Sequence, residues 1–189
     1  MQFITNFIKR AFCDMPFTAI LVVLASLTSL IAALISQYVF GLEPCVLCIY
    51  QRIPYVFAIG FAILSYGIFR AHGASSIFFM FCAAVALFID AGIAGYHAGV
   101  EYQWWEGTSE CGGNLPSPDA TIEELRAAIL GAPVTKCTEA AWTMFGISMA
   151  GYNFFYAGGL AIMSLWSVIF EYRSSKIGEK QLENAEKSA

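Results

Sequence analysis

Long runs of apolar residues alternate with short polar segments along the chain. From Phe17 to Phe40, 24 consecutive residues carry no charged side chain. As an α-helix this run would extend roughly 36 Å, which exceeds the thickness of a bilayer's hydrocarbon core. Three further apolar stretches predict spans at about 49–69, 77–96 and 149–170. The pattern therefore predicts four transmembrane helices.

Composition supports a membrane protein. Of the 189 residues, 58% are hydrophobic and only 13% are charged, whereas a soluble domain carries about twice that charged fraction. The first apolar stretch is too long for a secretory signal, and three more spans follow it. We therefore expect an all-α membrane protein in which residues 1–189 form a single integral membrane domain, a four-transmembrane-helix bundle.

The placement of basic residues predicts how the bundle is oriented. Basic side chains flank the first span, the turn at 70–76 and the end of the last span; they are Lys9, Arg10, Arg70, Arg173, Lys176, Lys180 and Lys187. The loop at 98–146 holds two basic residues against seven acidic ones. The positive-inside rule places both termini in the cytoplasm and the loops at 41–48 and 98–146 outside. The net charge of −4 comes largely from the outer loop, and we find no nucleic-acid motif.

Four of the six cysteines fall in the outer loops, in two pairs: Cys45 with Cys48, and Cys111 with Cys137. Three interpretations are open, namely a disulfide staple, a zinc site with four cysteine ligands, and a redox centre. A staple suits the distant pair, but closing a loop of a few residues removes little chain entropy. Zinc sites favour two tight pairs. Cys-X-X-Cys is typical of thiol exchange, so the tight pair favours redox chemistry.

The stretch from Cys45 to Arg52 could form a reaction centre at the membrane surface. If the second span begins near Cys48, the helix dipole favours a thiolate there. Arg52 lies one turn further on the same face and could donate hydrogen bonds to a flat ligand, although an arginine at a helix end can equally anchor to lipid headgroups. No nucleotide, haem or iron–sulfur motif is present, so by elimination we expect a lipid-soluble quinone as electron acceptor.

The long outer loop contains a segment with the pattern of a short amphipathic helix. In residues 117–131, Thr121 and Glu124 match a capping box and Gly131 is a plausible end. Its apolar residues share one face, which suits a helix lying on the bilayer surface, or one packed against the rest of the loop. A loop tethered in this way could carry its cysteines between an outside partner and the Cys45–Cys48 pair.

Two further polar residues stand at or within the third span. His97 lies at its outer end, close in depth to Arg52, where a hydrogen-bonded histidine is a more ordinary interpretation than a proton donor. Asp90 lies inside the span, where a carboxyl group is costly and is a functional candidate. A proton route between the two is conceivable, but we favour a protonated or helix-paired Asp90.

Three segments together resemble one known family. They are Pro-Cys-Val-Leu-Cys with Gln-Arg at 44–52, Gly-Tyr-His-Ala-Gly-Val-Glu at 95–101, and the run from Cys137 to Asn153. The combination resembles the bacterial DsbB family of disulfide-forming membrane oxidoreductases, over all four spans. The resemblance implies a bundle in the inner membrane that reoxidises a soluble, thioredoxin-fold periplasmic protein, DsbA, and passes the electrons to ubiquinone or menaquinone.

The resemblance also implies a role for each outer cysteine. Cys111 would form the mixed disulfide with the partner, and Cys137 would resolve it. Cys45 would exchange with the Cys111–Cys137 pair, and Cys48 would be the thiolate that meets the quinone.

On the quinone side, Arg52 would contact the quinone, and His97 lies near the position of the family's quinone-proximal histidine. Two departures concern Gln51, where some members have an acidic residue, and Thr138, where an aspartate is frequent. Neither removes a redox group, and no metal is implied.

Two competing functions remain open at this stage. A relative of vitamin K epoxide reductase is a weaker match, because there the Cys-X-X-Cys lies in the last part of the bundle, whereas here it opens the second span. A disulfide-stapled scaffold or transporter subunit is the non-enzymatic alternative.

Overall fold

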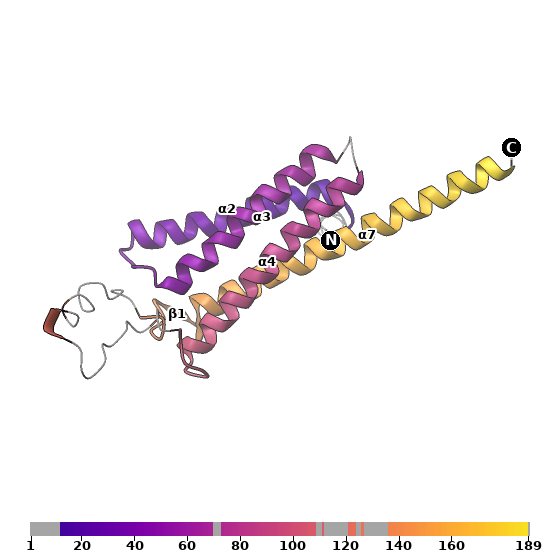
Figure 1. Cartoon of the computed structure of the whole chain (residues 1–189). Helices are drawn as coiled ribbons and strands as arrows, with labels where there is room; N and C mark the ends of the chain where they lie inside the picture. Colours follow the sequence, from indigo (N-terminus) through magenta and orange to yellow (C-terminus); the bar gives the residue numbers. More distant parts are fainter. Residues whose placement is uncertain are drawn as a thin grey trace. The chain divides into compact units, whose positions relative to one another are not determined.

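The structure, a computed structural model, describes residues 12–69, 73–108, 111, 121–123, 126 and 136–188. Its long helices are α2 (Met15–Tyr38), α3 (Val46–Ile68), α4 (Gly73–Glu101) and α7 (Met149–Ser188) (Figure 1). Within the described ranges, these 4 helices are long and apolar enough to cross a membrane. The predicted all-α bundle of four apolar helices is confirmed.

The helix bounds differ from the predicted spans chiefly at the ends of α4 and α7. The third span was expected at 77–96, but α4 runs from Gly73 to Glu101, and α7 continues far beyond 170 to Ser188. The last part of α7 is polar, and ion pairs such as Lys176 with Glu179 support it. Hydropathy marks where a helix leaves the membrane, whereas the backbone pattern can continue into water.

Two compact units divide the chain. One is formed by Met1–Ser29, Tyr55–Phe88 and Gly158–Ala189, the other by Leu30–Pro54 and Ile89–Ala157. Each unit includes a part of every long helix. The expectation of one domain over 1–189 stays a prediction.

In the first unit, small side chains allow the helices to approach closely. Fully buried alanines occur on three of its helices; they are Ala58, Ala62, Ala83 and Ala161. Buried hydroxyl groups add bonds between helices: Thr18 Oγ1 donates to Ser167 Oγ at 3.1 Å, and Ser76 Oγ donates to the Ser65 carbonyl at 2.7 Å. This unit is held by close packing and a few polar contacts.

The second unit contains a small hairpin that the sequence analysis did not predict. Strand β1 (Thr143–Met144) pairs antiparallel with β2 (Ile147–Ser148). The two turn residues, Phe145 and Gly146, have φ of 51° and 77°. Positive φ at both positions is the geometry of a type I′ turn, whose twist suits paired strands.

The hairpin joins the end of α4 to the start of α7. Tyr102, just after α4, donates its hydroxyl to the Gly146 carbonyl at 2.8 Å and accepts the Ser148 N–H at 3.1 Å. Ser148 Oγ in turn accepts the Gly151 N–H at 3.1 Å, which is the bond of a helix N-cap. One tyrosine and one serine therefore fix where α7 begins.

A pair of stacked rings closes the end of α4. Trp105 donates its indole N–H to the Tyr96 carbonyl at 2.9 Å, and the two rings stack with centroids 6.0 Å apart. Tyr96 also donates its hydroxyl to the Glu106 carbonyl at 3.0 Å. The chain after α4 turns back so that the Trp105 ring lies against Gly99. Glycine leaves the space for this ring, because a Cβ there would overlap the indole.

Parts of the predicted topology lie outside the described residues. They include the basic residues Lys9, Arg10 and Arg70, and most of the segment 117–131 for which an amphipathic helix was predicted. Those expectations stay predictions.

Replacing Gly99 by alanine should destabilise the second unit. The added methyl displaces the Trp105 ring, so the indole hydrogen bond and the stack on Tyr96 are lost, at about 1–2 kcal/mol. Denaturation in detergent, followed by tryptophan fluorescence, measures this loss. Gly92→Ala on the same helix is the matched control, since its Cβ would meet no atom within 4 Å. Equal stability of the two variants would contradict the packing described for Gly99.

Candidate functional site

The four cysteines predicted to face outward meet in one buried cluster. Cys111 and Cys137 form a disulfide that joins residues 26 apart in sequence, with their Cα atoms 5.0 Å apart. This disulfide packs with Cys45, and both disulfide sulfurs belong to residues that are at most 2% exposed. Among the residues that the structure describes, the cluster contains Cys45, Leu47, Val100, Cys111 and Cys137, with Cys48 and Tyr96 packed against it.

The start of α3 determines which sulfur occupies the helix terminus. The helix begins at Val46, earlier than the position near Cys48 considered from the sequence, so Cys45 is the residue directly before it. The Cys48 N–H donates to Cys45 Sγ at 3.3 Å, in the way that an N-cap side chain takes up a free backbone N–H. The Cys48 sulfur lies 2.9 Å from the same atom.

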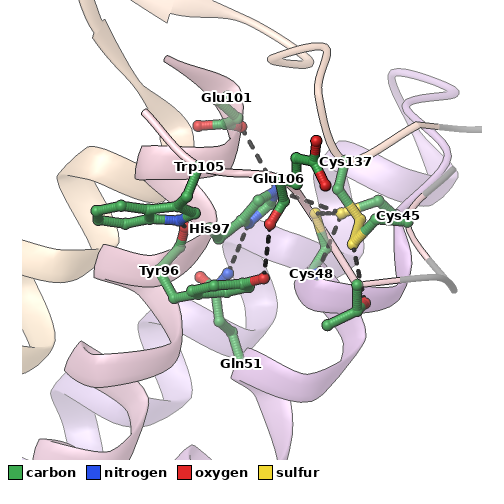
Figure 2. Close-up of a disulfide and its surroundings, with 11 residues drawn as sticks. Cys45, Cys48, Gln51, Tyr96, His97, Glu101, Trp105, Glu106 and Cys137 are labelled. Carbon is green, nitrogen blue, oxygen red and sulfur yellow. Dashed lines mark hydrogen bonds and ion pairs between the residues drawn. A yellow bond between two sulfur atoms is a disulfide. The ribbon is translucent and has the colours of Figure 1, made fainter. Parts of the chain in front are cut away.

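His97 of α4 contacts Cys45 (Figure 2). Its Nε2 atom lies 3.4 Å from Cys45 Sγ and 3.6 Å from a carboxylate oxygen of Glu101, one turn further along α4. The ring is only 3% exposed. The histidine predicted at the outer end of the third span thus lies beside the first cysteine of the tight pair.

These donors act on the charge of Cys45. The hydrogen bond from the Cys48 thiol, supported by the His97 ring and the Cys48 backbone, lowers the pKa of Cys45 from 9.0 to about 4, although burial acts in the opposite direction. Deprotonation of this thiol is therefore favoured at neutral pH. From the sequence, a stabilised thiolate was expected at Cys48. The structure gathers the donors around Cys45, because the helix starts two residues earlier and His97 reaches that sulfur.

Arg52 lies one turn beyond Cys48 on α3 and is half-buried. Its Nη1 atom donates to Gln37 Oε1 on α2 at 2.8 Å. Within the described part of the chain, its Nε atom is buried and has no hydrogen-bond partner. The guanidinium is thus held in place and keeps one buried donor available for a ligand.

A line of polar side chains continues from His97 into the apolar part of α4. Gln51 Nε2 lies 2.8 Å from His97 Nδ1, and Asn153 Nδ2 donates to both Gln51 Oε1 at 2.8 Å and Asp90 Oδ2 at 3.1 Å. Asp90 is fully buried, and its bond to Asn153 pairs the carboxyl with a residue of α7. The favoured interpretation was a protonated or helix-paired carboxyl, and its protonation stays a prediction.

Sequence reasoning missed Asn153 as a site residue and saw Gln51 only as a departure from the family. Asp90 and His97 are seven residues apart, so they share one face of α4. The sequence signal that could have identified Asn153 is its position as a polar residue near the start of the apolar fourth span.

The cluster also contains a possible set of metal ligands. The donor atoms of Cys45, Cys48 and His97 all lie within 4.8 Å of one another. Two sulfurs bound to one tetrahedral zinc ion would be about 3.8 Å apart, as Zn–S distances near 2.3 Å require. The observed 2.9 Å between the two sulfurs suits a pair that exchanges a disulfide better than it suits two zinc ligands.

Comparison with known proteins places the chain in one family. Residues 16–167 match the family described as "Disulfide bond formation protein DsbB". A protein named "Disulfide bond formation protein B" from Acinetobacter baumannii is 31% identical over 85% of this chain and 94% of its own length. One of the same name from Stutzerimonas stutzeri is 31% identical over 72% of this chain and 84% of its own.

An uncharacterized protein of Rickettsia prowazekii is 27% identical over 80% of this chain and 86% of its own length. No solved structure gives a significant match. With four apolar helices, two cysteine pairs in one buried cluster and a family match over most of its length, the chain belongs to the DsbB family.

Proposed function

We propose that this protein is a membrane protein-disulfide:quinone oxidoreductase. It reoxidises a periplasmic DsbA-like protein of thioredoxin fold and passes the electrons to ubiquinone or menaquinone. The observation that carries this proposal is the buried cluster in which the Cys111–Cys137 disulfide packs against Cys45. Family membership supports it.

The exchange starts at the outer-loop disulfide. A thiolate of the partner attacks Cys111, forms a mixed disulfide, and releases Cys137 as a thiolate. Cys137 then attacks Cys45 in an oxidised Cys45–Cys48 pair, forms a Cys45–Cys137 disulfide, and releases Cys48 as a thiolate. The partner's second thiolate, in place of the Cys137 that the resemblance implied, attacks the mixed disulfide, because attack by Cys137 would release the partner still reduced. The partner therefore leaves oxidised and Cys111 leaves as a thiolate. Each step makes one S–S bond and breaks one.

Cys111 then attacks Cys137 to restore the outer disulfide, and Cys45 is released. The donors around Cys45 favour this release, because a leaving thiolate departs faster when its pKa is low. At this point Cys45 and Cys48 hold the two electrons taken from the partner. A stabilised thiolate also favours the reduced pair, which makes the Cys45–Cys48 disulfide a better oxidant of the outer pair.

The residues present fit a quinone on the Cys48 side of α3. A bound quinone supplies an acceptor for two electrons and two protons. The buried Nε of Arg52, which lacks a partner within the described residues, can donate to a carbonyl oxygen there. Gln37 holds the guanidinium in place, and Cys48 lies one turn earlier on the same helix. The family's quinone-side role for His97 stays a prediction, beside the contact with Cys45 described above.

We further propose the bacterial inner membrane as its location, with both termini in the cytoplasm. The four candidate spans and the excess of basic residues at the ends of the chain support this orientation. In that orientation the cysteine cluster faces the oxidising periplasm, where its partner would be found.

Removing either sulfur of the tight pair should abolish quinone reduction. We expect Cys45→Ser and Cys48→Ser to lower turnover by on the order of 10³-fold, because a serine hydroxyl cannot form a disulfide. Purified protein, a reduced DsbA-like partner and a soluble quinone analogue provide the assay. Cys82→Ser, on α4 and outside the cluster, is the control. Normal turnover of Cys48→Ser would refute the relay and leave a stapled scaffold.

The reduced protein should keep a thiolate well below neutral pH. Because the pKa of Cys45 is lowered to about 4, the thiolate is present above that pH and is lost as the pH falls through about 4. The ultraviolet absorbance difference between reduced and oxidised protein measures it. His97→Ala should move the midpoint upward, since one donor to the sulfur is removed. A midpoint near 9 in the unchanged protein would contradict the donor arrangement.

Arg52→Lys should weaken quinone affinity while the charge is kept. An ammonium group cannot both replace the bond to Gln37 and present a second planar donor, so we expect the KM for quinone to rise about tenfold. Steady-state kinetics at saturating partner concentration give this value. Arg173→Lys, on the polar end of α7, is the control. An unchanged KM would leave Arg52 as a headgroup anchor.

A further inference from the structure

A row of buried polar side chains connects the Cys45 sulfur with a carboxyl group inside the apolar part of α4. Its members come from three helices of the second unit: Gln51 from α3, His97 and Asp90 from α4, and Asn153 from α7. His97, Gln51 and Asp90 are each at most 8% exposed. Buried polar groups of this kind are costly unless they are bonded, so the direction of each hydrogen bond is restricted.

An acceptor on Asp90 sets the direction of the first bonds. Asp90 Oδ2 accepts a hydrogen bond from Asn153, so Asn153 presents its NH₂ group, which carries two hydrogens. One hydrogen goes to Asp90 Oδ2 at 3.1 Å and the other to Gln51 at 2.8 Å. Gln51 therefore presents its oxygen to Asn153 and its own NH₂ group to the other side.

The same direction continues to the sulfur. Gln51 donates from Nε2 to His97 Nδ1 at 2.8 Å, so Nδ1 must be unprotonated and the neutral ring carries its hydrogen on Nε2. Nε2 faces Cys45 Sγ at 3.4 Å and Glu101 Oε1 at 3.6 Å. A thiolate and a carboxylate both accept, so both groups facing Nε2 agree with this tautomer.

We propose that Asp90 and Asn153 are positioning residues which, acting through Gln51, hold His97 in its Nε2–H tautomer so that the ring donates to the Cys45 sulfur. The proposal rests on the proposed function in giving Cys45 a part in exchange. A purely structural role for the same residues would join the three helices but would not require one tautomer.

Nuclear magnetic resonance of isotope-labelled histidine tests the tautomer directly, because protonated and unprotonated ring nitrogens have different chemical shifts. The chain has 2 histidines, so a His72→Gln background leaves the signal of His97 alone. In the reduced protein at neutral pH we expect Nε2 protonated and Nδ1 unprotonated. The opposite tautomer, or an even mixture, would overturn the proposal.

Asn153→Asp is the informative variant because it keeps the side chain's shape. Two adjacent carboxyls at 90 and 153 share a proton, which leaves only an accepting oxygen toward Gln51. Gln51 must then turn its NH₂ group toward position 153 and its oxygen toward His97. We expect His97 to change to the Nδ1–H tautomer, and the midpoint of the thiolate titration to rise by about one pH unit as a donor to the sulfur is lost.

Two further variants keep the test decisive if Asn153→Asp fails to fold. Asp90→Asn lets position 90 present either an accepting oxygen or a donating NH₂ group to Asn153, so the direction of the row is no longer set and a mixture of tautomers should result. Ser76→Ala removes a different buried hydroxyl of α4 and should leave the tautomer unchanged. If neither substitution, at 90 or at 153, alters the tautomer, the positioning role is wrong.

These measurements use the reduced protein without partner or quinone. A protein that shows the predicted tautomers but does not reduce quinone would retain this inference and lose the proposed function. If the unchanged protein reduces quinone but its His97 carries the hydrogen on Nδ1, the proposed function is retained and this inference is lost.

Discussion

The site depends on gathering hydrogen-bond donors around one buried sulfur. Cys45 is 4% exposed, and a charge taken out of water to that extent is unstable unless the protein replaces the lost solvation. The replacement comes from the first turn of α3, through the Cys48 N–H and thiol, and from His97 on α4. The features that fix the end of α4, which carries His97, therefore also affect the chemistry. The stacked Tyr96 and Trp105 and the hairpin bonded to Tyr102 fix the end of α4 and the start of α7.

Much of the architecture could be read from the sequence because membrane helices have a strong and simple signal. An uninterrupted apolar run is enough to locate a span. Most of the predicted span ends lie within a few residues of the observed helix ends. The polar continuation of α7 was missed since hydropathy has no information about a helix that continues in water. The hairpin was missed for a different reason: its turn uses Phe145 at positive φ, whereas the recognisable type I′ signal is Asn-Gly or Asp-Gly.

The sequence indicates most of the residues that belong to the candidate site. It does not indicate which cysteine sulfur receives the hydrogen-bond donors or which of the site residues contact one another. Motif spacing and the expected side of the membrane were enough to select the cysteine pairs, Arg52 and His97 as candidates, and their roles stay predictions. Which sulfur attracts the donors depends on where α3 begins. The helix starts at Val46, two residues before Cys48, which leaves Cys45 as the residue directly before its first turn. The contacts of Gln51 with His97 and Asn153 join residues 46 and 102 positions apart, and no local pattern encodes such pairings. The i, i+7 spacing of Asp90 and His97 is the part of this network that sequence periodicity does contain.

The nearly complete burial of the outer-loop disulfide has a consequence for selectivity. Cys111 and Cys137 are 2% and 1% exposed, so a small reductant dissolved in the surrounding water has almost no line of approach to either sulfur. An attacking protein can offset the work of uncovering Cys111 with the free energy of its own docking, whereas a free low-molecular-weight thiol has little such contact to offer. Steric shielding of this kind protects the disulfide from reduction by small thiols. It does so without making the disulfide a weaker oxidant.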